Sequence, residues 1–450
     1  MNGLVMDISR LIDRAHFPTP TGIDRYELHY ALWVRERLKH PTRKANNSGF
    51  IETGRRGAAA VQAKRADKLI SCLSQRWSSE KLSPSQAVLL DQIAAAIDGK
   101  IGWQSVKNNT GNESSGSIYT LRKSTRLLLN DLVRLRCLPI NTSMMHVSHS
   151  RLDCPGAFSW LGQSQPSSIF YVHDLIPLSH PEFVRAEEPR RHFRRMETIL
   201  AHAALVLCNS QATARAFRSF AQEQNRPLPS IAVLPPGIED CFSSVSQKDW
   251  PKPKNCYFVT VGTIEPRKNH ILLLRLWQHL VERDGFRAPR LVIVGKRGWE
   301  NGHVLAMLER CPALRGFVIE VPNLGDAALA RLLVGASALL APSFAEGYGM
   351  PISEALAARL PVIASNIPSH REAGGGAIFL DPFDGLSWRT AIDAITASPR
   401  QQKPPMSTPH RWSVHFDDLE GLIKNGMAVH HYAAQRAPRQ IWSFSPGTCE

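Results

Sequence analysis

Short apolar runs of strand length alternate with stretches of helical periodicity through the second half of the chain. Strands are expected at residues 257–262, 291–295, 317–321, 338–341 and 361–365. Helices are expected at residues 269–283, at residues 328–334 and after Pro351. Because strand and helix taking turns is typical of a doubly wound parallel sheet, the pattern predicts an α/β domain with its ligand crevice at the carboxyl ends of the strands.

The first half shows the same alternation less regularly. Strands are expected at residues 5–9, 143–148, 168–172, 204–208 and 231–234, and an amphipathic helix follows the turn-rich start of residues 18–34. Residues 41 to about 116 are polar, basic and helix-prone in patches, and long polar insertions of this kind are usually loops. Residues 238–255 are rich in Ser, Pro and Lys, so they predict an interdomain linker.

These patterns predict two α/β domains and a tail. The first domain covers residues 1–240 and carries a polar insertion at about residues 41–120. The second covers residues 241–405. Residues 406–450 form the tail, and a late helix within residues 412–423 is expected to pack back on the first domain, by analogy with other proteins of this two-domain architecture.

The stretch Ala341 to Glu354 predicts a strand, a glycine loop and a helix in that order. Pro342 ends the strand because it has no amide donor, and Pro351 suits the first turn of a helix. The loop therefore combines unpaired backbone N–H groups with the positive end of a helix dipole, which can receive an anion or a sugar hydroxyl. The residues expected to bind this ligand are Gly347, Tyr348, Gly349 and Met350.

Two carboxylates flank this loop. Glu346 precedes it, and Glu354 follows about one turn into the helix, with seven residues between them. Because helical side chains lean toward the N-terminus, both carboxylates are expected to face one ligand. The alternative is that Glu354 only complements the helix dipole and Glu346 is a solvated loop residue.

Three further positions lie where ligands bind in open α/β sheets. Arg267 and Lys268 follow a strand end and a glycine, so they can neutralise a diphosphate, although an RK pair alone also occurs on ordinary surfaces. His173 follows the strand at residues 168–172, which favours function over a purely structural role. Gly22 lies in a loop before a helix and is equally compatible with an ordinary turn.

Composition narrows the class of protein. The 450 residues are 43% hydrophobic and 21% charged, which describes an ordinary globular protein of two or three domains. We find no signal peptide and no apolar run of the ~18 residues that a membrane helix needs. The eight cysteines are scattered without CxxC pairs, so free thiols in a reducing cytoplasm are expected.

The net charge of +15 calls for an explanation, such as an anionic binding partner. Phosphorylated small molecules, an anionic membrane surface and nucleic acid all fit a basic chain. The chain contains no zinc-finger spacing and no aromatic RNA-binding motif, so nucleic acid is disfavoured. A lipid-linked acceptor at the inner membrane fits better, although surplus charge can also simply promote solubility. The basic helix face formed by Arg190, Arg191, Arg194 and Arg195 is by default a solvated face, and contact with an anionic lipid phosphate is the sharper alternative.

Several phrases of the sequence resemble one enzyme family. EGYGMPISEAL, starting at Glu346, resembles the EGFGLPxxEA signature of the retaining glycosyltransferases of family 4, with its E-x7-E pair. EPRKN at residues 265–269 resembles the phosphate-binding loop of family 4 mannosyltransferases, and YVHDLIPLSHPEF at residues 171–183 resembles an N-terminal segment of the family. The resemblance is strong over residues 255–382 and moderate over residues 144–237.

This resemblance implies a GT-B architecture, in which two Rossmann-like domains face a central cleft. It implies that Glu346 lies against the sugar being transferred and that Glu354 holds the ribose hydroxyls of the nucleotide. It also implies that Arg267 and Lys268 bind the diphosphate. Gly22 would face the same phosphates, and His173 would bind the sugar or orient the acceptor.

The implied function is metal-independent, retaining transfer of a sugar to a glycan or lipid-linked acceptor in cell-surface polysaccharide synthesis. No DxD pair lies in a suitable loop, which favours metal independence. GDP-mannose is the leading sugar donor, and UDP-sugars and GDP-fucose remain open. The expected location is the cytoplasm, with peripheral contact to the cytoplasmic face of the inner membrane.

Two residues that differ from the family's sequence motifs support an alternative function. Thr263 stands where an arginine is frequent, and Arg359 stands where a glycine is usual. A catalytically silent homologue that binds nucleotide sugar or glycan as an assembly partner is therefore the rival hypothesis. An NAD-dependent enzyme is disfavoured because no GxGxxG followed by an acidic residue is well placed.

Overall fold

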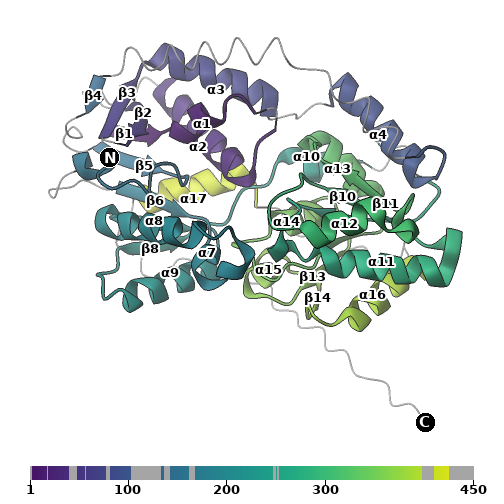
Figure 1. Ribbon diagram of the computed structural model, residues 1–450. Helices are drawn as coiled ribbons and strands as arrows, with labels where there is room; N and C mark the ends of the chain where they lie inside the picture. The colour runs from purple at the N-terminus through teal and green to yellow at the C-terminus, as the bar shows by residue number, and fades with distance from the viewer. Residues whose placement is uncertain are drawn as a thin grey trace.

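The protein forms two α/β lobes that meet along the carboxyl ends of their sheets (Figure 1). The computed structural model describes residues 3–17, 19–39, 48–55, 57–77, 82–102, 133–135, 142–161, 168–246, 250, 253–397 and 410–424. The N-terminal lobe contains strands β1 to β8, the C-terminal lobe contains strands β9 to β14, and the contact between them is called the interlobe junction below.

The N-terminal lobe is built on an eight-stranded sheet in the order β4-β3-β2-β1-β5-β6-β7-β8. Pairing is parallel from β2 to β8, whereas β3 runs antiparallel to both β2 and β4. The strands are β1 (Gly3–Asp7), β2 (Gly49–Gly54), β3 (Gly57–Val61), β4 (Val133–Leu135), β5 (Thr142–His146), β6 (Ser168–Val172), β7 (Leu205–Cys208) and β8 (Ser230–Val233).

Helices cover both faces of this sheet, as alternating β and α elements require. They are α1 (Ser9–Arg14), α2 (Gly22–Lys39), α3 (Ala63–Trp77), α7 (Ile176–Ser179), α8 (Glu188–His202) and α9 (Gln211–Glu223). One core cluster, around Met6 and Tyr30, lies under α1, α2 and α3, and a second, around Phe170 and Phe217, lies under α8 and α9.

The C-terminal lobe is a six-stranded parallel sheet in the order β11-β10-β9-β12-β13-β14. Its strands are β9 (Tyr257–Val261), β10 (Arg290–Val294), β11 (Val318–Val321), β12 (Ala338–Ala341), β13 (Val362–Ser365) and β14 (Ile378–Leu380). Its helices are α10 (Asp240–Ser244), α11 (His270–Asp284), α12 (Gly302–Arg310), α13 (Asp326–Gly335), α14 (Met350–Ala357), α15 (Pro368–Ala373) and α16 (Gly385–Ala397). The predicted alternation and the doubly wound sheet are confirmed, and the two lobes together form a GT-B architecture.

The segment predicted to be polar loops contains regular structure. Residues 49–61 form β2 and β3, and residues 63–77 form α3. Helix α4 (Pro84–Ile97) follows, and it buries Leu90, Ile93 and Ile97 in the core of the C-terminal lobe rather than in its own half of the chain. In Figure 1 this early, blue helix lies beside the green elements α13 and β11. The insertion is therefore not confined to the first domain, and its low-complexity part at residues 108–117 lies outside the described residues.

The reverse arrangement occurs near the C-terminus, where a late helix packs on the N-terminal lobe. Helix α17 (Trp412–Lys424), yellow in Figure 1, buries Leu419 and Leu422 in the core of the N-terminal lobe. The chain thus crosses between the lobes again before α17. This crossing lies beside the one near residue 238. The amide of Ile238 donates to the carbonyl of His410 at 2.8 Å, and a parallel bridge joins Ile238 to Arg411. The predicted linker at residues 238–255 is therefore paired with the returning chain at its first residue.

None of the helices within the described ranges is long and apolar enough to cross a membrane. The cysteines that the structure describes form no disulfide, in agreement with the expectation of free thiols, and they are Cys72, Cys154, Cys208, Cys241, Cys256 and Cys311.

Candidate active site at the interlobe junction

The chain from β12 into α14 forms the predicted strand, loop and helix. Gly349 precedes the helix with φ of 111°, a backbone conformation that disfavours side chains, and Pro351 lies in the first turn. A Cβ at Gly349 would approach Cδ2 of His370 to 3.1 Å. The glycine therefore allows the loop to turn closely over α15 and to aim the N-terminus of α14 at the interlobe junction.

Glu346 is the centre of a compact cluster of charges. Its Oε2 lies 2.5 Å from Nη1 of Arg267, its Oε1 lies 2.5 Å from Nζ of Lys268, and Ser343 donates to Oε1 at 2.8 Å. Burial acts to raise the pKa of Glu346, but the charges of Arg267 and Lys268 outweigh it and hold that pKa well below its usual range. Glu346 is therefore a carboxylate at neutral pH although its side chain is only 10% exposed.

The turn after β9 places both cations. Arg267 and Lys268 lie in the 3-10 turn Pro266–Lys268, and the carbonyl of Arg267 accepts from the amide of Phe344 at 2.8 Å, which ties this turn to the loop before Glu346. The side chain of Lys268 passes over Gly262, where a Cβ would lie 3.0 Å from Cε of the lysine. Two loops far apart in the sequence thus converge on one carboxylate.

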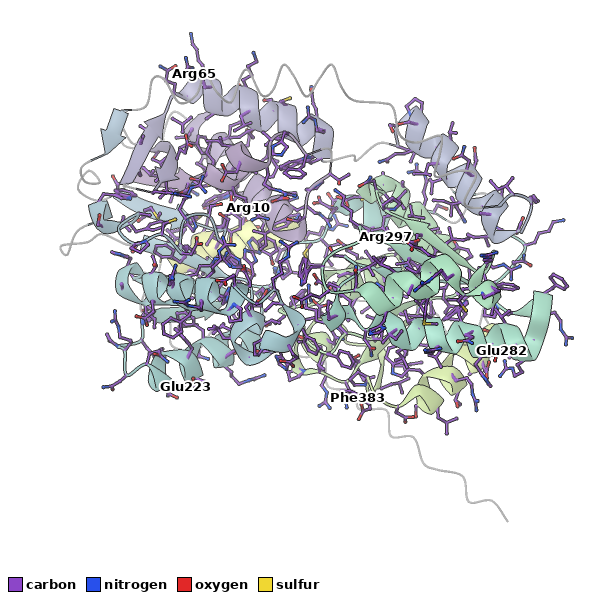
Figure 2. The ribbon with its side chains drawn as sticks, viewed as in Figure 1. Arg10, Arg65, Glu223, Glu282, Arg297 and Phe383 are labelled. Atoms are coloured by element: carbon purple, nitrogen blue, oxygen red, sulfur yellow. The ribbon has the colours of Figure 1, made fainter. Side chains whose placement is uncertain are left out.

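Glu354 has a different partner, which crosses the junction. Nη1 of Arg25, on α2 of the N-terminal lobe, donates to its Oε1 at 2.9 Å. Nη2 of Arg25 lies 3.3 Å from Asp326 and 3.9 Å from Glu239, and Glu239 is 2.5 Å from Nε2 of His29. Side chains fill this junction between the two lobes, with Arg10 labelled on the N-terminal side in Figure 2.

His173 lies on the N-terminal side of the junction, at the end of β6. Its Nε2 lies 2.8 Å from the carbonyl oxygen of Val147, and the ring packs edge-on against Tyr26. Burial lowers the pKa of His173 to about 4, so the ring is neutral at pH 7. A neutral ring that donates through Nε2 leaves Nδ1 as an acceptor for a hydroxyl.

The lobes also come close together at Gly347. A Cβ at this position would lie 2.1 Å from the carbonyl oxygen of His173. The carbonyl of Gly347 accepts from Ser210 at 2.7 Å and from Thr213 at 3.2 Å. On α15, Glu372 accepts from the first amides of α9 at 2.6 and 2.8 Å. The structure therefore holds the lobes together directly over the glycine loop.

The remaining predicted residues lie nearby without a shared ligand contact. Tyr348 packs against the core of the C-terminal lobe, and Met350 packs against the core of the N-terminal lobe. Gly22 is the first residue of α2, and no atom lies within 4 Å of a Cβ built there, so the fold itself does not require a glycine. Among the predicted site residues, the structure brings Glu346, Arg267 and Lys268 into direct contact.

Sequence reasoning missed the residues that cross the junction, chiefly Arg25, Ser210 and Glu372. Arg25 follows Gly22 by three positions in TGIDRY, and the signal that could have found it is a charged residue beside the buried face of α2. Its partner Glu354 is 329 residues away in the sequence, so no local pattern connects the two.

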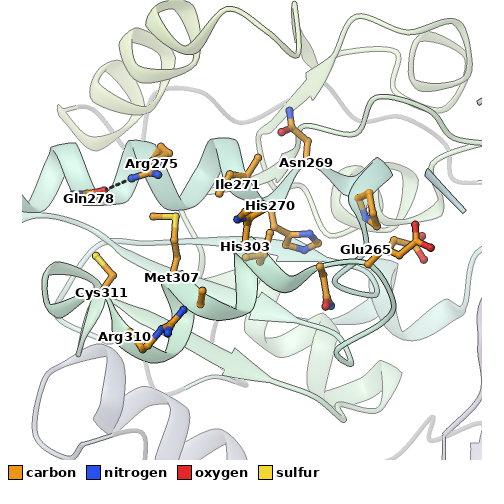
Figure 3. A pocket seen from close by; sticks show the side chains of 15 residues that line it. Glu265, Asn269, His270, Ile271, Arg275, Gln278, His303, Met307, Arg310 and Cys311 are labelled. Atoms are coloured by element: carbon orange, nitrogen blue, oxygen red, sulfur yellow. Dashed lines mark hydrogen bonds between the residues drawn. The ribbon is translucent and has the colours of Figure 1, made fainter. Parts of the chain in front are cut away.

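A separate hollow lies between α11 and α12 (Figure 3). Its volume is about 680 Å³, and its lining includes His270, Met307 and Arg310. Glu265 lines one end of it and also pairs with Arg267 at 2.6 Å, so this residue is shared with the Glu346 cluster. No pattern in the sequence pointed to this hollow.

Comparison with known proteins shows what the second lobe is similar to. Residues 244–376 match the family model described as glycosyl transferases group 1. The serotype-specific mannosyltransferase WbdA of Escherichia coli is 30% identical over 272 residues, which are 57% of this chain and 33% of WbdA. The O-antigen chain mannosyltransferase B of Escherichia coli is 30% identical over 234 residues, which are 50% of this chain and 58% of that protein.

The chain spans only about a third of the length of the first curated relatives that it matches, at 32 to 35%. Among solved structures, HepE (Alr3699) of Anabaena in complex with UDP aligns with a TM-score of 0.56 at 11% identity, covering 94% of this chain and 100% of HepE. That likeness concerns the fold, and it extends over both lobes. Residues 244–376, which match the model of the group 1 glycosyl transferases, contain Glu346, Glu354 and the Arg267–Lys268 pair.

Proposed function

We propose that the protein is a metal-independent, retaining glycosyltransferase of family 4 that moves mannose from GDP-mannose to a glycan or lipid-linked acceptor in cell-surface polysaccharide synthesis. The observation that carries this proposal is the contact of Glu346 with Arg267 and Lys268 beside the N-terminus of α14. Mannose is favoured because WbdA and two O-antigen chain proteins among the curated relatives are described as mannosyltransferases, whereas others are described as D-inositol 3-phosphate glycosyltransferases.

The reaction needs charge stabilisation at two places. When the bond between the anomeric carbon and the diphosphate breaks, negative charge grows on the leaving group, and positive charge grows on the sugar ring. Arg267, Lys268 and the dipole of α14 can meet the negative charge, because fixed cations and dipoles aimed at developing charge lower the barrier. Glu346, a carboxylate at neutral pH, can stabilise or position the positive ring.

Retention requires the acceptor hydroxyl to attack from the face that the diphosphate leaves. The new bond joins the acceptor oxygen to the anomeric carbon, and the proton of the hydroxyl passes to a leaving phosphate oxygen. His173 lies opposite the glycine loop, with its backbone carbonyl close to Gly347. Its neutral ring can bind a sugar hydroxyl or orient the acceptor. Contacts between the lobes at Gly347 exclude water from the reacting centre, which limits hydrolysis of the sugar donor.

The acceptor side is proposed to lie at the cytoplasmic face of the inner membrane. Arg190, Arg191 and Arg194 project from α8 as exposed residues, and Phe193 beside them is 38% exposed. Arg195, predicted as part of this face, is instead buried and pairs with Glu188. A basic helix face with an exposed aromatic side chain favours contact with anionic headgroups. Nucleic acid is not part of the proposal.

Ligand binding and product analysis test this function. A nucleotide sugar that binds the folded protein raises its melting temperature as the ligand concentration increases. GDP-mannose, GDP-fucose and UDP-glucose are compared first by this measure. The nucleotide released with a lipid-linked acceptor is then quantified with and without EDTA, and the anomeric configuration of the product is read by NMR.

Stabilisation by GDP-mannose, EDTA-resistant nucleotide release and a retained anomeric centre are the expected results. Stabilisation by a nucleotide sugar without any transfer or hydrolysis would instead support the silent homologue. No stabilisation by any nucleotide sugar would refute the proposal.

A further inference from the structure

Arg25 is the most enclosed cation of the interlobe junction that the proposed chemistry leaves unused. It lies on α2 of the N-terminal lobe with its side chain 16% exposed, yet its hydrogen-bond partner, Glu354, belongs to α14 of the C-terminal lobe. Within the described residues, the one side-chain hydrogen bond that Glu354 receives comes from Arg25 and reaches Oε1. The Nε of Arg25 has no partner in the described part of the chain.

Acidic groups outnumber cations around this contact. The titratable groups that face Glu354 are Arg25 and His29 from α2, Glu239 and Cys241 at the start of α10, and Asp326 from the start of α13. Three carboxylates thus share one guanidinium, because Arg25 lies 2.9 Å from Glu354, 3.3 Å from Asp326 and 3.9 Å from Glu239. Without Arg25, the carboxylates would repel one another in a poorly hydrated site.

Burial and repulsion both act on the charge of Glu354. Burial raises the pKa of Glu354 above its ordinary value, the charges of Asp326 and Glu239 raise it further, and Arg25 is the cation that opposes them in part. Burial alone would lower the pKa of Arg25, but the surrounding carboxylates raise it, so the guanidinium stays charged at every pH of interest. The charge on Glu354 therefore depends on a residue of the other lobe.

We propose that Arg25 is a positioning residue of the sugar-donor site, which holds the carboxylate of Glu354 charged and oriented so that it can bind the ribose hydroxyls of the nucleotide. This inference rests on the proposed function. A charged carboxylate can accept hydrogen bonds from both O–H groups of a ribose diol, whereas one oxygen of a protonated carboxyl carries the proton and acts as a donor. Hydrogen bonds to a charged acceptor are also roughly twice as strong as neutral ones.

Arg25 and the ribose do not compete for the same atoms. The arginine occupies one lone pair of Oε1, and a carboxylate offers about four such sites over its two oxygens. Because Arg25 and Glu354 belong to different lobes, the charged acceptor is complete only while the lobes are together. Recognition of the ribose is thereby linked to closure of the junction.

The test compares GDP with 2′,3′-dideoxy-GDP, and UDP with its dideoxy analogue, by titration calorimetry between about pH 6 and 9. We expect the wild type to prefer the ribonucleotide by ~10- to 100-fold, which is typical of hydrogen bonds to a charged acceptor, with little change over this range. Arg25→Met should lose most of this preference at pH 7 and regain it as the pH rises, because Glu354 then ionises without the arginine. Arg25→Lys should retain it in part.

Arg35→Met is the matched control. Arg35 lies on the same helix, and its ion pairs with Glu36 and Asp67 stay within the N-terminal lobe, so its loss should leave the ribose preference unchanged. Glu354→Gln serves as a second variant should Arg25→Met fold poorly, and it should lose the preference at every pH because an amide cannot ionise.

Three outcomes would overturn the inference. An Arg25→Met protein that keeps the wild-type ribose preference at all pH values shows that Glu354 needs no help from Arg25. Equal weakening of the ribonucleotide and its dideoxy analogue shows a purely structural role. A wild type that binds neither nucleotide refutes the proposed function itself, whereas binding that is unchanged in the variant refutes only the role of Arg25.

Discussion

Gly347→Ala tests whether the lobes must close over the glycine loop. The added Cβ would lie 2.1 Å from the carbonyl oxygen of His173, 3.1 Å from Nδ2 of Asn209 and 3.2 Å from Cβ of Asp174. The nearest atom is main chain and cannot rotate away, so the lobes must separate by on the order of 1 Å to restore an ordinary contact. The hydrogen bond from Ser210 to the Gly347 carbonyl would lengthen with them.

Overpacking of this kind costs about 1–3 kcal/mol, which corresponds to a roughly 5- to 150-fold fall in the population of the closed form. If nucleotide binding needs the closed form, the affinity for GDP falls by the same factor. Calorimetry measures the affinity, and small-angle X-ray scattering compares the radius of gyration. Gly375→Ala is the control, because a Cβ there meets no atom within 4 Å. Wild-type affinity together with a wild-type radius in Gly347→Ala would refute the reasoning.

Three further predictions concern the charge cluster and one helix end. Glu346→Gln and Lys268→Ala should each reduce sugar transfer by ~100-fold or more at saturating nucleotide sugar, because both remove electrostatic groups at the reacting centre; a variant that keeps a tenth of wild-type transfer would contradict this role. Because the folded state holds the pKa of Glu346 below its usual range, its contribution to stability is full above about pH 5 and is lost as the pH falls. Urea unfolding of wild type and Glu346→Gln should therefore differ most near neutral pH and converge in acid, whereas a constant difference would exclude this linkage. Arg359→Gly should stabilise the protein by about 0.5–1 kcal/mol, because φ of 56° at the end of α14 disfavours a side chain; thermal unfolding measures this, and a lowered midpoint would show that the arginine side chain makes a stabilising contact.

The central strands of the two sheets were predictable because they are buried on both faces and read as short apolar runs, whereas the edge strand β14, where Ile378 is 38% exposed, was not predicted. Residues 338–341, ALLA, and 168–172, SIFYV, form strands at the predicted positions. By contrast, β3 reads GAAAV, and alanine and glycine carry little strand signal. Its pairing with β2 therefore depends on tertiary contacts that the local sequence does not encode.

The same limit applies to the site. Arg267, Lys268 and Glu346 each follow a strand that can be recognised locally, so their convergence follows from the rule that parallel strands end at one edge of the sheet. Arg25 and Glu354 meet only because the two lobes pack against each other in one orientation. The role of Gly22 was assigned by resemblance alone, and it stays a prediction.

The mutual exchange of α4 and α17 constrains how the gene can be divided. A cut at the linker near residue 240 separates α4, whose Leu90, Ile93 and Ile97 cover the C-terminal core, from the lobe that it covers. The same cut leaves α17 on the C-terminal fragment and so separates it from the N-terminal core against which it packs. Chimaeras that trade sugar-donor specificity between relatives will therefore need four junctions, on either side of α4, at the linker and before α17, instead of one.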